Sequence, residues 1–355
     1  MLPTGSVPPL RMRPPALRPP RRAPRPAPPA LLPPLATGVA LAVAIVAAAP
    51  SRVGAQTAQE VAHCEHAVDR RLAEARARLQ QLAEGGTPSA SFAAGCLALA
   101  DGRAADAERH FRRLVEGGSP GASAHYWLGR AYGEQAQRAN PLRQASLARR
   151  TKGEFERAVQ LDPDYVDARE GLMQFYLRAP GVMGGSEAKA REQAQEIARR
   201  NRYRGGLALA VVSTRRKDLA GAAREYEQLA AQFPDSSAPW TQLAALHAQQ
   251  RQWDQAFATI ERMQRAQPAS MPAQYALGRL AAESGMQLER GEQALRRYLT
   301  HQPRPNEPPL ANAHWRLGAI LERQGRPELA RAEYRTAVRL DPALRPAREA
   351  LAKLE

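Results

Sequence analysis

Aromatic residues and strand-forming patterns are scarce in this 355-residue sequence. Few β-branched residues occur in alternation, which argues against a β fold. Aromatic residues make up only 5% of the chain, whereas alanine is abundant and apolar residues reach 44%. Alanine has the best helix propensity and lets helix backbones approach closely, so the composition predicts an all-α protein with a large core. The length allows one to three ordinary domains or one solenoid.

Lysine is also scarce, since only four of the 51 basic residues are lysine. The formal net charge is +16, but residues 1–55 contain seven arginines and no acid. The remainder carries 44 basic and 35 acidic residues, which alternate as they do on solvated helix faces. Arginine in place of lysine, with abundant alanine and proline, is typical of a GC-rich genome. The charge therefore argues only weakly for a nucleic-acid partner, and we do not expect one.

The first 55 residues have the organisation of an export signal. Residues 1–34 are crowded with proline and arginine. Leu35–Ala49 is an uncharged apolar run, too short for a comfortable membrane span of about 20 residues. Small residues follow it directly, and no cysteine lies among them, so we expect no lipoprotein anchor. We expect cleavage after Ala55 and a periplasmic or secreted mature chain. The alternatives are an inner-membrane anchor through residues 35–49 and a true start at Met12.

Two stretches of the sequence share one spacing of apolar and small residues. The first contains Trp240, Leu243, Ala244, His247, Ala256, Ile260, Met263 and Pro268. The second contains, at identical intervals, His314, Leu317, Gly318, Leu321, Ala330, Tyr334, Ala337 and Pro342. This spacing resembles that of the tetratricopeptide repeat family, whose 34-residue unit pairs two helices. The resemblance implies an all-α right-handed superhelix, because one unit cannot bury its apolar face alone and must stack on the next.

Seven such units can be placed along the chain, with inserted residues in the second, third and sixth. The predicted units are 88–121, 122–164, 165–202, 203–236, 237–270, 271–310 and 311–344. The third is the weakest, because it lacks the closing proline and Gly171-Leu172 reverse the usual order. An apolar stripe at steps of three and four predicts one capping helix over residues 57–84. A second capping helix is expected over residues 345–355.

Three short motifs invite a catalytic or metal-binding interpretation. Ser186 starts an S-x-x-K spacing, but no S-D-N or K-T-G string accompanies it, so we expect it to cap a helix. Gly117–Gly121 matches G-x-S-x-G, but the oxyanion donor would be Pro120, which has no N–H. The H-C-E-H stretch at residues 63–66 places two histidines three apart, yet zinc usually needs three or four protein ligands. We therefore expect no catalytic residue, no metal and no cofactor.

The only two cysteines, Cys64 and Cys96, each lie on the apolar stripe of a predicted helix. These two helices are expected to be neighbours, and an exported chain meets oxidising conditions. We therefore predict a disulfide that ties the N-terminal capping helix to the first unit. Two buried free thiols are the alternative.

The family resemblance implies a concave groove lined by the first helix of each unit. Carried over unit by unit, the lining positions hold Tyr126, Arg130, Arg169, Met173, Tyr176, Arg204, Thr241, Tyr275, Arg279 and Trp315. These positions mix aromatic residues with arginines and include no acid. Aromatic rings offer a broad contact area, and arginine can bind a carboxylate through two hydrogen bonds. We therefore expect an extended ligand with acidic groups or a free C-terminus.

The whole pattern predicts a non-catalytic scaffold that binds a protein or peptide. No region outside the repeats is large enough for a separate catalytic domain. The Lys and Asn set with which co-chaperone members of the family hold a carboxylate is absent, which argues against chaperone-type binding. We expect a role in an envelope assembly or transport complex. The alternative is a membrane-anchored accessory subunit of an envelope enzyme or of a polysaccharide or secretion system.

Overall fold

The structure is a computed structural model that describes residues 58–69, 73–85, 87–117 and 121–354. The chain divides into two units, residues 1–51 and 52–355, and all described residues belong to the second. The expected leader, including the apolar run and the cleavage position, lies outside the described residues. Within the described ranges, no helix has both the length and the apolar character that a membrane span requires.

All regular structure in the described ranges is helical, with seventeen α-helices, one 3-10 turn and no strand. The first nine elements are α1 (Ala58–Val68), α2 (Ala73–Ala83), α3 (Pro88–Ala100), α4 (Ala104–Glu116), α5 (Ala122–Gln137), α6 (Pro141–Leu161), α7 (Val166–Arg178), η1 (Gly181–Met183) and α8 (Glu187–Arg200). They are followed by α9 (Arg202–Arg215), α10 (Leu219–Gln232), α11 (Ser237–Gln249), α12 (Trp253–Ala266), α13 (Met271–Ser284), α14 (Leu288–Tyr298), α15 (Leu310–Arg323), α16 (Pro327–Leu340) and α17 (Arg345–Ala352).

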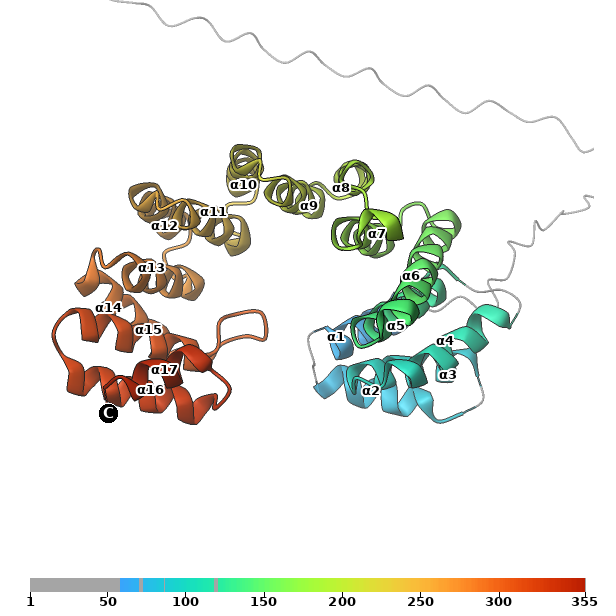
Figure 1. Cartoon of the computed structure of the whole chain (residues 1–355), viewed down its shortest axis with the longest axis horizontal. Coiled ribbons are helices and arrows are strands. Elements are labelled where there is room, and N and C mark those ends of the chain that lie inside the picture. The colour runs from blue at the N-terminus through green and yellow to red at the C-terminus, as the bar shows by residue number, and fades with distance from the viewer. Residues whose placement is uncertain (1–57, 70–72, 86, 118–120, 355) are drawn as a thin grey trace, which may run out of the picture. The chain divides into compact units, whose positions relative to one another are not determined.

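The helices of this unit form a single curved row in which each helix packs against the next (Figure 1). Seven hairpins, from α3–α4 to α15–α16, correspond to the seven predicted units, although α9 and α15 begin one residue ahead of the predicted boundaries. The first helix of a hairpin also packs against the first helix of the next, as α13 does against α15. The fold is therefore the predicted all-α solenoid, and α17 closes it at the C-terminal end.

The prediction of one capping helix over residues 57–84 is wrong, because this segment forms the two helices α1 and α2. Both helices pack against α3, which has only 13 residues. A continuous helix over 57–84 would be about 42 Å long, roughly twice the length of α3, and half of its apolar stripe would find no partner. As two separate helices, α1 buries Cys64 and α2 buries Leu79.

Small residues on the first helix of a hairpin receive a large side chain from the second. A Cβ atom at Gly129 would lie 2.8 Å from the ring of Phe155, and one at Gly318 would lie 2.5 Å from the ring of Tyr334. Both distances are shorter than any normal carbon–carbon contact, so only glycine permits these helix pairs to pack at this separation. Phe155 also lies against Gly171 of the next hairpin, and it thereby links two repeats.

Candidate functional site

A cavity of about 760 Å³ opens between α5, α6 and α7. Its walls are the first helices of two successive hairpins, and its floor is the second helix of the earlier one. The lining residues are Asp69, Tyr126, Arg130, Gly133, Glu134, Ala136, Gln137, Gln144, Ala148, Thr151, Phe155, Asp167, Glu170, Gly171, Gln174, Phe175, Arg178, Ala179, Pro180 and Met183. This volume lies within the range of about 300–1,000 Å³ that is usual for ligand pockets.

The cavity forms where two insertions into the repeat meet. One insertion lengthens α6 to 21 residues, and the other adds the η1 turn between α7 and α8. These two segments are in contact, and both contribute lining residues. They also carry the two most exposed large apolar side chains of the described ranges, Leu142 at 88% and Val182 at 93% exposure. The departures from a regular repeat thus build one concavity with apolar residues near its rim.

The η1 segment owes its shape to a glycine and a serine. Gly184 has a φ of +96°, which glycine adopts without strain. The Ser186 hydroxyl accepts a hydrogen bond from the backbone N–H of Lys189 at 3.3 Å, so the predicted helix cap is confirmed. The backbone N–H of Ser186 donates to the carbonyl of Tyr176, which anchors the segment to α7. Capping therefore accounts for the position of Ser186.

The inner end of the cavity contains a cluster of charged side chains from four helices. We call its carboxyl groups the acidic end of the cavity: Asp69, Asp167 and Glu170 line the cavity, and Glu65 is hydrogen-bonded to Asp167. Two arginines lie among them. Arg130 donates to both carboxylate oxygens of Asp69, at 2.8 and 2.7 Å, and lies over the ring of Trp127. Arg204 donates to Glu170 at 2.8 Å and to Asp167.

A disulfide holds α1 in the position from which its acids reach this cluster. Cys64 of α1 is bonded to Cys96 of α3, with 5.3 Å between their Cα atoms. Glu65 follows the bonded cysteine directly, and Asp69 lies just after the end of α1. The N-terminal hairpin, which the sequence indicated only as a cap, therefore supplies two of the four carboxylates of the acidic end.

Burial and neighbouring carboxylates perturb the ionisation of Glu65. Burial first, and then the charge of and hydrogen bond with Asp167, raise the pKa of the Glu65 carboxyl to about 7, while Arg204 opposes this effect. Glu134, which lines the wall of the cavity, also has a raised pKa because it is half-buried. Burial likewise raises the pKa of the Tyr126 hydroxyl, which therefore stays protonated and available as a hydrogen-bond donor.

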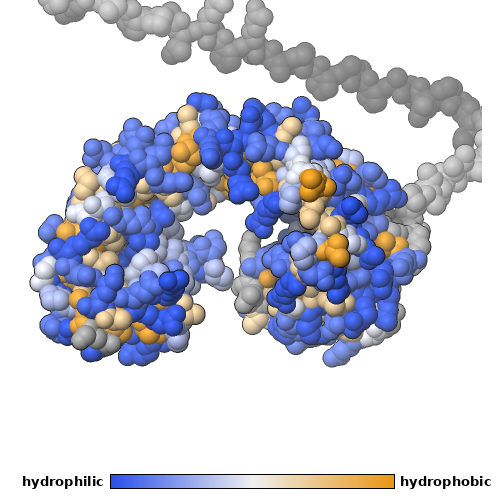
Figure 2. All heavy atoms as spheres, in the orientation of Figure 1, coloured by the Kyte–Doolittle hydropathy of each residue, from blue (hydrophilic) through white to orange (hydrophobic). Residues whose placement is uncertain are grey.

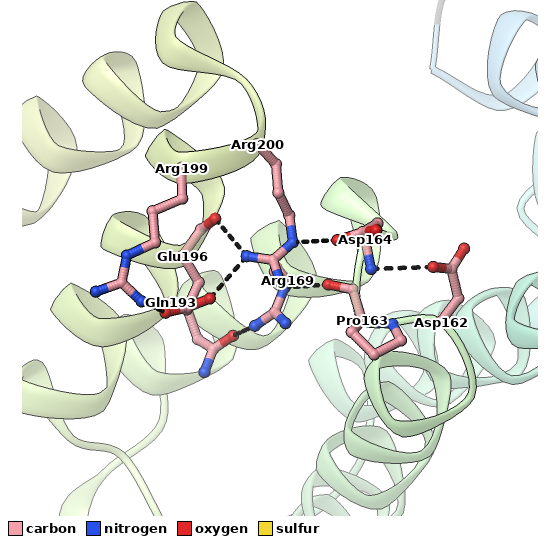
Figure 3. Close-up of polar contacts among 8 residues, drawn as sticks. All are labelled: Asp162, Pro163, Asp164, Arg169, Gln193, Glu196, Arg199 and Arg200. Carbon is pink, nitrogen blue, oxygen red and sulfur yellow. Dashed lines mark hydrogen bonds and ion pairs between the residues drawn. The ribbon is translucent and has the colours of Figure 1, made fainter.

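Of the ten predicted groove residues, Tyr126 and Arg130 line the cavity, and Arg204 lies in its acidic end. The placement of Arg169, Met173 and Tyr176 in a groove is wrong, because they are buried at 7%, 3% and 6% exposure. Arg169 donates to the carbonyl of Pro163 and to the side chain of Gln193 on α8 (Figure 3). It therefore joins the two helices of its hairpin instead of facing a ligand.

The error has a geometric cause in α7. Gly171 precedes Leu172, the reverse of the usual order, and it lies against Phe155 of the preceding hairpin instead of receiving a side chain from its own. The helix is thus rotated from the predicted frame. Asp167, Glu170, Gln174 and Arg178 face the cavity in place of the predicted residues. The reversed Gly-Leu pair was the feature of the sequence that could have identified them.

The other predicted groove residues lie in the C-terminal repeats, away from the cavity. Thr241 is half-buried, and its hydroxyl donates to the carbonyl of Ala238. Tyr275 and Trp315 are half-buried and belong to one apolar cluster. Arg279 makes no hydrogen bond or ion pair within the described ranges, and its Nε atom is buried without a partner. It is the one predicted arginine that has neither a hydrogen bond nor an ion pair in the described ranges.

No group of three or more histidine, cysteine or acidic side chains gathers in metal-binding geometry among the described residues. Cys64 of the H-C-E-H stretch is in the disulfide and is therefore no ligand. On the face shown in Figure 2, the helical unit is mostly hydrophilic, with apolar side chains scattered among polar ones. The cavity is thus the main concave feature to which a ligand role can be assigned.

Helix hairpins stacked in one direction, most of them with a small residue facing a large one, define an α-solenoid. The chain contains tetratricopeptide repeats: residues 92–139 and 311–344 match models described as "Tetratricopeptide repeat". Among curated proteins, none matches this chain.

Several solved structures have similar folds. A tetratricopeptide repeat protein from Parabacteroides merdae is 15% identical with a TM-score of 0.45, and the match covers 83% of this chain and 97% of that one. Yeast Tom70 is 10% identical with a TM-score of 0.47, over 76% of this chain and 64% of its own. Pseudomonas aeruginosa pilF is 15% identical with a TM-score of 0.42, over 65% of this chain and 97% of its own.

Proposed function

We propose that this chain is a non-catalytic scaffold that binds an extended segment of a partner protein on the concave face of its repeats. The observation that carries the proposal is the cavity between α5, α6 and α7, which two repeat insertions build together. Regular repeats need no such insertions to stack. Lengthening α6 and adding η1 creates a concave surface with glycines in its walls, where a ligand backbone can approach closely.

We further propose that the scaffold works outside the cytoplasm, in an envelope assembly or transport complex. The leader with its basic region, apolar run and small residues supports this location. The bond between Cys64 and Cys96 supports it independently, because such bonds persist in oxidising compartments. A membrane-anchored accessory subunit of an envelope enzyme or secretion system remains the alternative role if the leader is retained.

We also propose that the ligand carries acidic groups or a free C-terminus. Arg279 is the side chain that would bind them. Its guanidinium has no intramolecular partner in the described ranges, and its Nε atom is buried. Arg316 lies on the next hairpin and pairs with Glu283 at 2.9 Å. A ligand carboxylate at Arg279 would satisfy a buried donor that the protein leaves unpaired.

Photo-cross-linking in the native cell tests the scaffold proposal. A benzoylphenylalanine at Gln174, which lines the cavity, is compared with one at Gln255, which is exposed on α12. We expect a discrete adduct of one partner from Gln174 and none of that mass from Gln255. Equal labelling at both positions, or no labelling at Gln174, would show that the cavity does not bind the partner.

A further inference from the structure

The acidic end of the cavity has more negative than positive side chains. Four carboxylates from α1 and α7 surround two guanidinium groups, and both guanidiniums are already engaged in ion pairs. Glu134, one helical turn beyond Arg130, adds another carboxylate without an ion pair closer than 4 Å in the described ranges. Arg178 lies on the same helix as Asp167, eleven residues away and about 16 Å along α7, and Arg138 acts on Glu134 from the end of α5. The end keeps an excess of negative charge that a further cation would reduce.

Two hydroxyl groups in the same place lack hydrogen-bond partners. Tyr126 lines the cavity at 9% exposure, and its hydroxyl makes no hydrogen bond within the described residues. The Tyr165 hydroxyl is fully buried and also has none, and the two rings are 5.3 Å apart. A fully buried hydroxyl is normally bonded, so the Tyr165 hydroxyl is an exception, whereas the Tyr126 side chain lines the cavity, where a ligand can supply a partner. They lie among the charges of Glu65, Asp69 and Asp167.

The acidic end is accessible from the open part of the cavity. The side chains of Asp69 and Glu170 are 48% and 35% exposed, so an incoming group can reach their carboxylates. Phe155 and Phe175 line the cavity beside them. A basic side chain has an aliphatic stem that packs on such rings while its charged head reaches the carboxylates. Burial is the largest cause of the raised pKa of Glu65, and the charges of Asp167 and Asp69, which add to it, are the part that a bound cation would offset.

We propose that the acidic end receives an arginine or lysine side chain of a bound peptide segment, and that an adjacent apolar residue of that segment packs on Phe155 and Phe175. This inference rests on the proposed scaffold function and specifies the chemistry of its ligand. It differs from the expectation of an acidic ligand, which concerns Arg279 in the distant C-terminal repeats. A partner with a basic and apolar stretch followed by an acidic one would satisfy both sites.

A random peptide display library tests the inference with the full chain. Library members have blocked termini, and binders are selected on the wild-type protein. The same selection is run at pH 8, where Glu65 is mostly ionised, on the variant Glu65→Gln with Glu134→Gln, which removes two carboxylates that make no ion pair with arginine. The matched control is Glu227→Gln with Glu289→Gln, two exposed glutamates on α10 and α14. Melting curves establish that all three proteins are folded.

We expect binders to the wild-type protein to be enriched in arginine or lysine next to an apolar residue. A synthesised binder should lose affinity about tenfold on the double variant and keep it on the control, because one charge-assisted contact is removed. Tyr126→Phe, which removes only a hydroxyl, should weaken the same peptide and serves as the second test if the double variant fails to fold.

The outcomes separate this inference from the proposed function. Binders without basic residues, or binders whose affinity the Glu65 and Glu134 changes do not affect, would overturn the inference and leave the scaffold function in place. If the wild-type chain binds no peptide at all, both the scaffold function and this inference are contradicted. Displacement of the peptide by spermidine at equal concentration would show that a free cation, instead of a peptide side chain, occupies the site.

Discussion

The arginines predicted for the groove fall into two groups. Most of them make hydrogen bonds or ion pairs within the protein, and one of them does not. Arg130 makes a two-point ion pair with Asp69 and lies 4.7 Å from the centre of the Trp127 ring. Arg279 has no such partner in the described ranges. The same side-chain type therefore stabilises the fold at one position and is available for binding at the other.

This difference predicts opposite effects of the same substitution. Arg130→Ala should lower the free energy of unfolding by about 1–2 kcal/mol, because an ion pair and a ring contact are lost together. Arg279→Ala should leave the melting temperature unchanged and weaken binding of an acidic peptide, with an effect that shrinks as salt rises. Thermal melts and peptide titrations at two salt concentrations measure both. Equal destabilisation by the two changes would contradict the distinction.

Glycine at the hairpin contacts gives a second prediction at this scale. Gly318→Ala should destabilise the protein by about 1–3 kcal/mol, because its new Cβ would lie 2.5 Å from the Tyr334 ring. Gly153 is a matched control in the interior of α6, where nothing lies within 4 Å of the new Cβ. Gly153→Ala should therefore stabilise the helix by roughly 0.5–1 kcal/mol. Chemical denaturation of both variants gives the comparison, and the same sign for both would refute the packing explanation.

At the scale of elements, the hairpin α1–α2 depends on one covalent bond. Cys64 and Cys96 are separated by 32 positions, and closing a loop of this length stabilises the folded state by roughly 3–4 kcal/mol on the chain-entropy model. We expect reduction, or replacement of both cysteines by alanine, to increase hydrogen exchange in α1 and α2 far more than in α13 to α17. Uniform exchange over the whole row would show that the bond does not act locally.

The docking of α1 should also respond to pH. The pKa of Glu65 is about 7 in the folded protein, above its usual value near 4.5, so the folded state binds a proton that the unfolded hairpin releases. This contribution to stability is complete below about pH 4.5 and is lost as pH rises through 7. Backbone amide hydrogen exchange in α1 should therefore increase between pH 5.5 and 8 by more than the intrinsic exchange rate does. Glu65→Gln should abolish that excess, and Glu227→Gln should not.

The elements that the sequence predicts well are those in which local pattern and packing agree. Tyr334 and Gly318 stand at the family spacing and meet in the structure. The prediction failed where packing overrides pattern. The stripe of residues 57–84 continues without a proline or glycine, yet the short partner helix α3 forces a turn. The groove face of α7 was misplaced because its rotation is set by Phe155 of the preceding hairpin, a contact that no local spacing encodes.

The acidic end could not be predicted for a related reason. Its members come from α1 and α7, with arginines from α5 and α9, and they meet only because successive hairpins turn about a common axis. That curvature is a property of the whole row. The spacing within each repeat identifies Arg130 and Arg204 but not the carboxylates that pair with them, which lie in other repeats. In a solenoid, residues that are far apart in sequence can share a site only through such curvature.

At the scale of the whole molecule, the export prediction connects the leader with the disulfide. We expect the chain isolated from its native cell to begin at Gln56, because the small residue at Ala55 follows the apolar run at a distance typical of signal cleavage. The intact mass before and after reduction measures both features at once. The mass of the oxidised mature chain should increase on reduction by the mass of two hydrogen atoms, because its two cysteines form a disulfide.

A blocked variant tests the order of these events. Ala55→Arg removes the small residue that cleavage requires, so we expect an uncleaved chain that stays with the membrane fraction and still gains two hydrogens on reduction, because export itself needs only the apolar run. Wild-type chain whose mass still includes Leu35–Ala49 would instead establish the anchored form. Free thiols in either chain would place the repeats in a reducing compartment and overturn the proposed location.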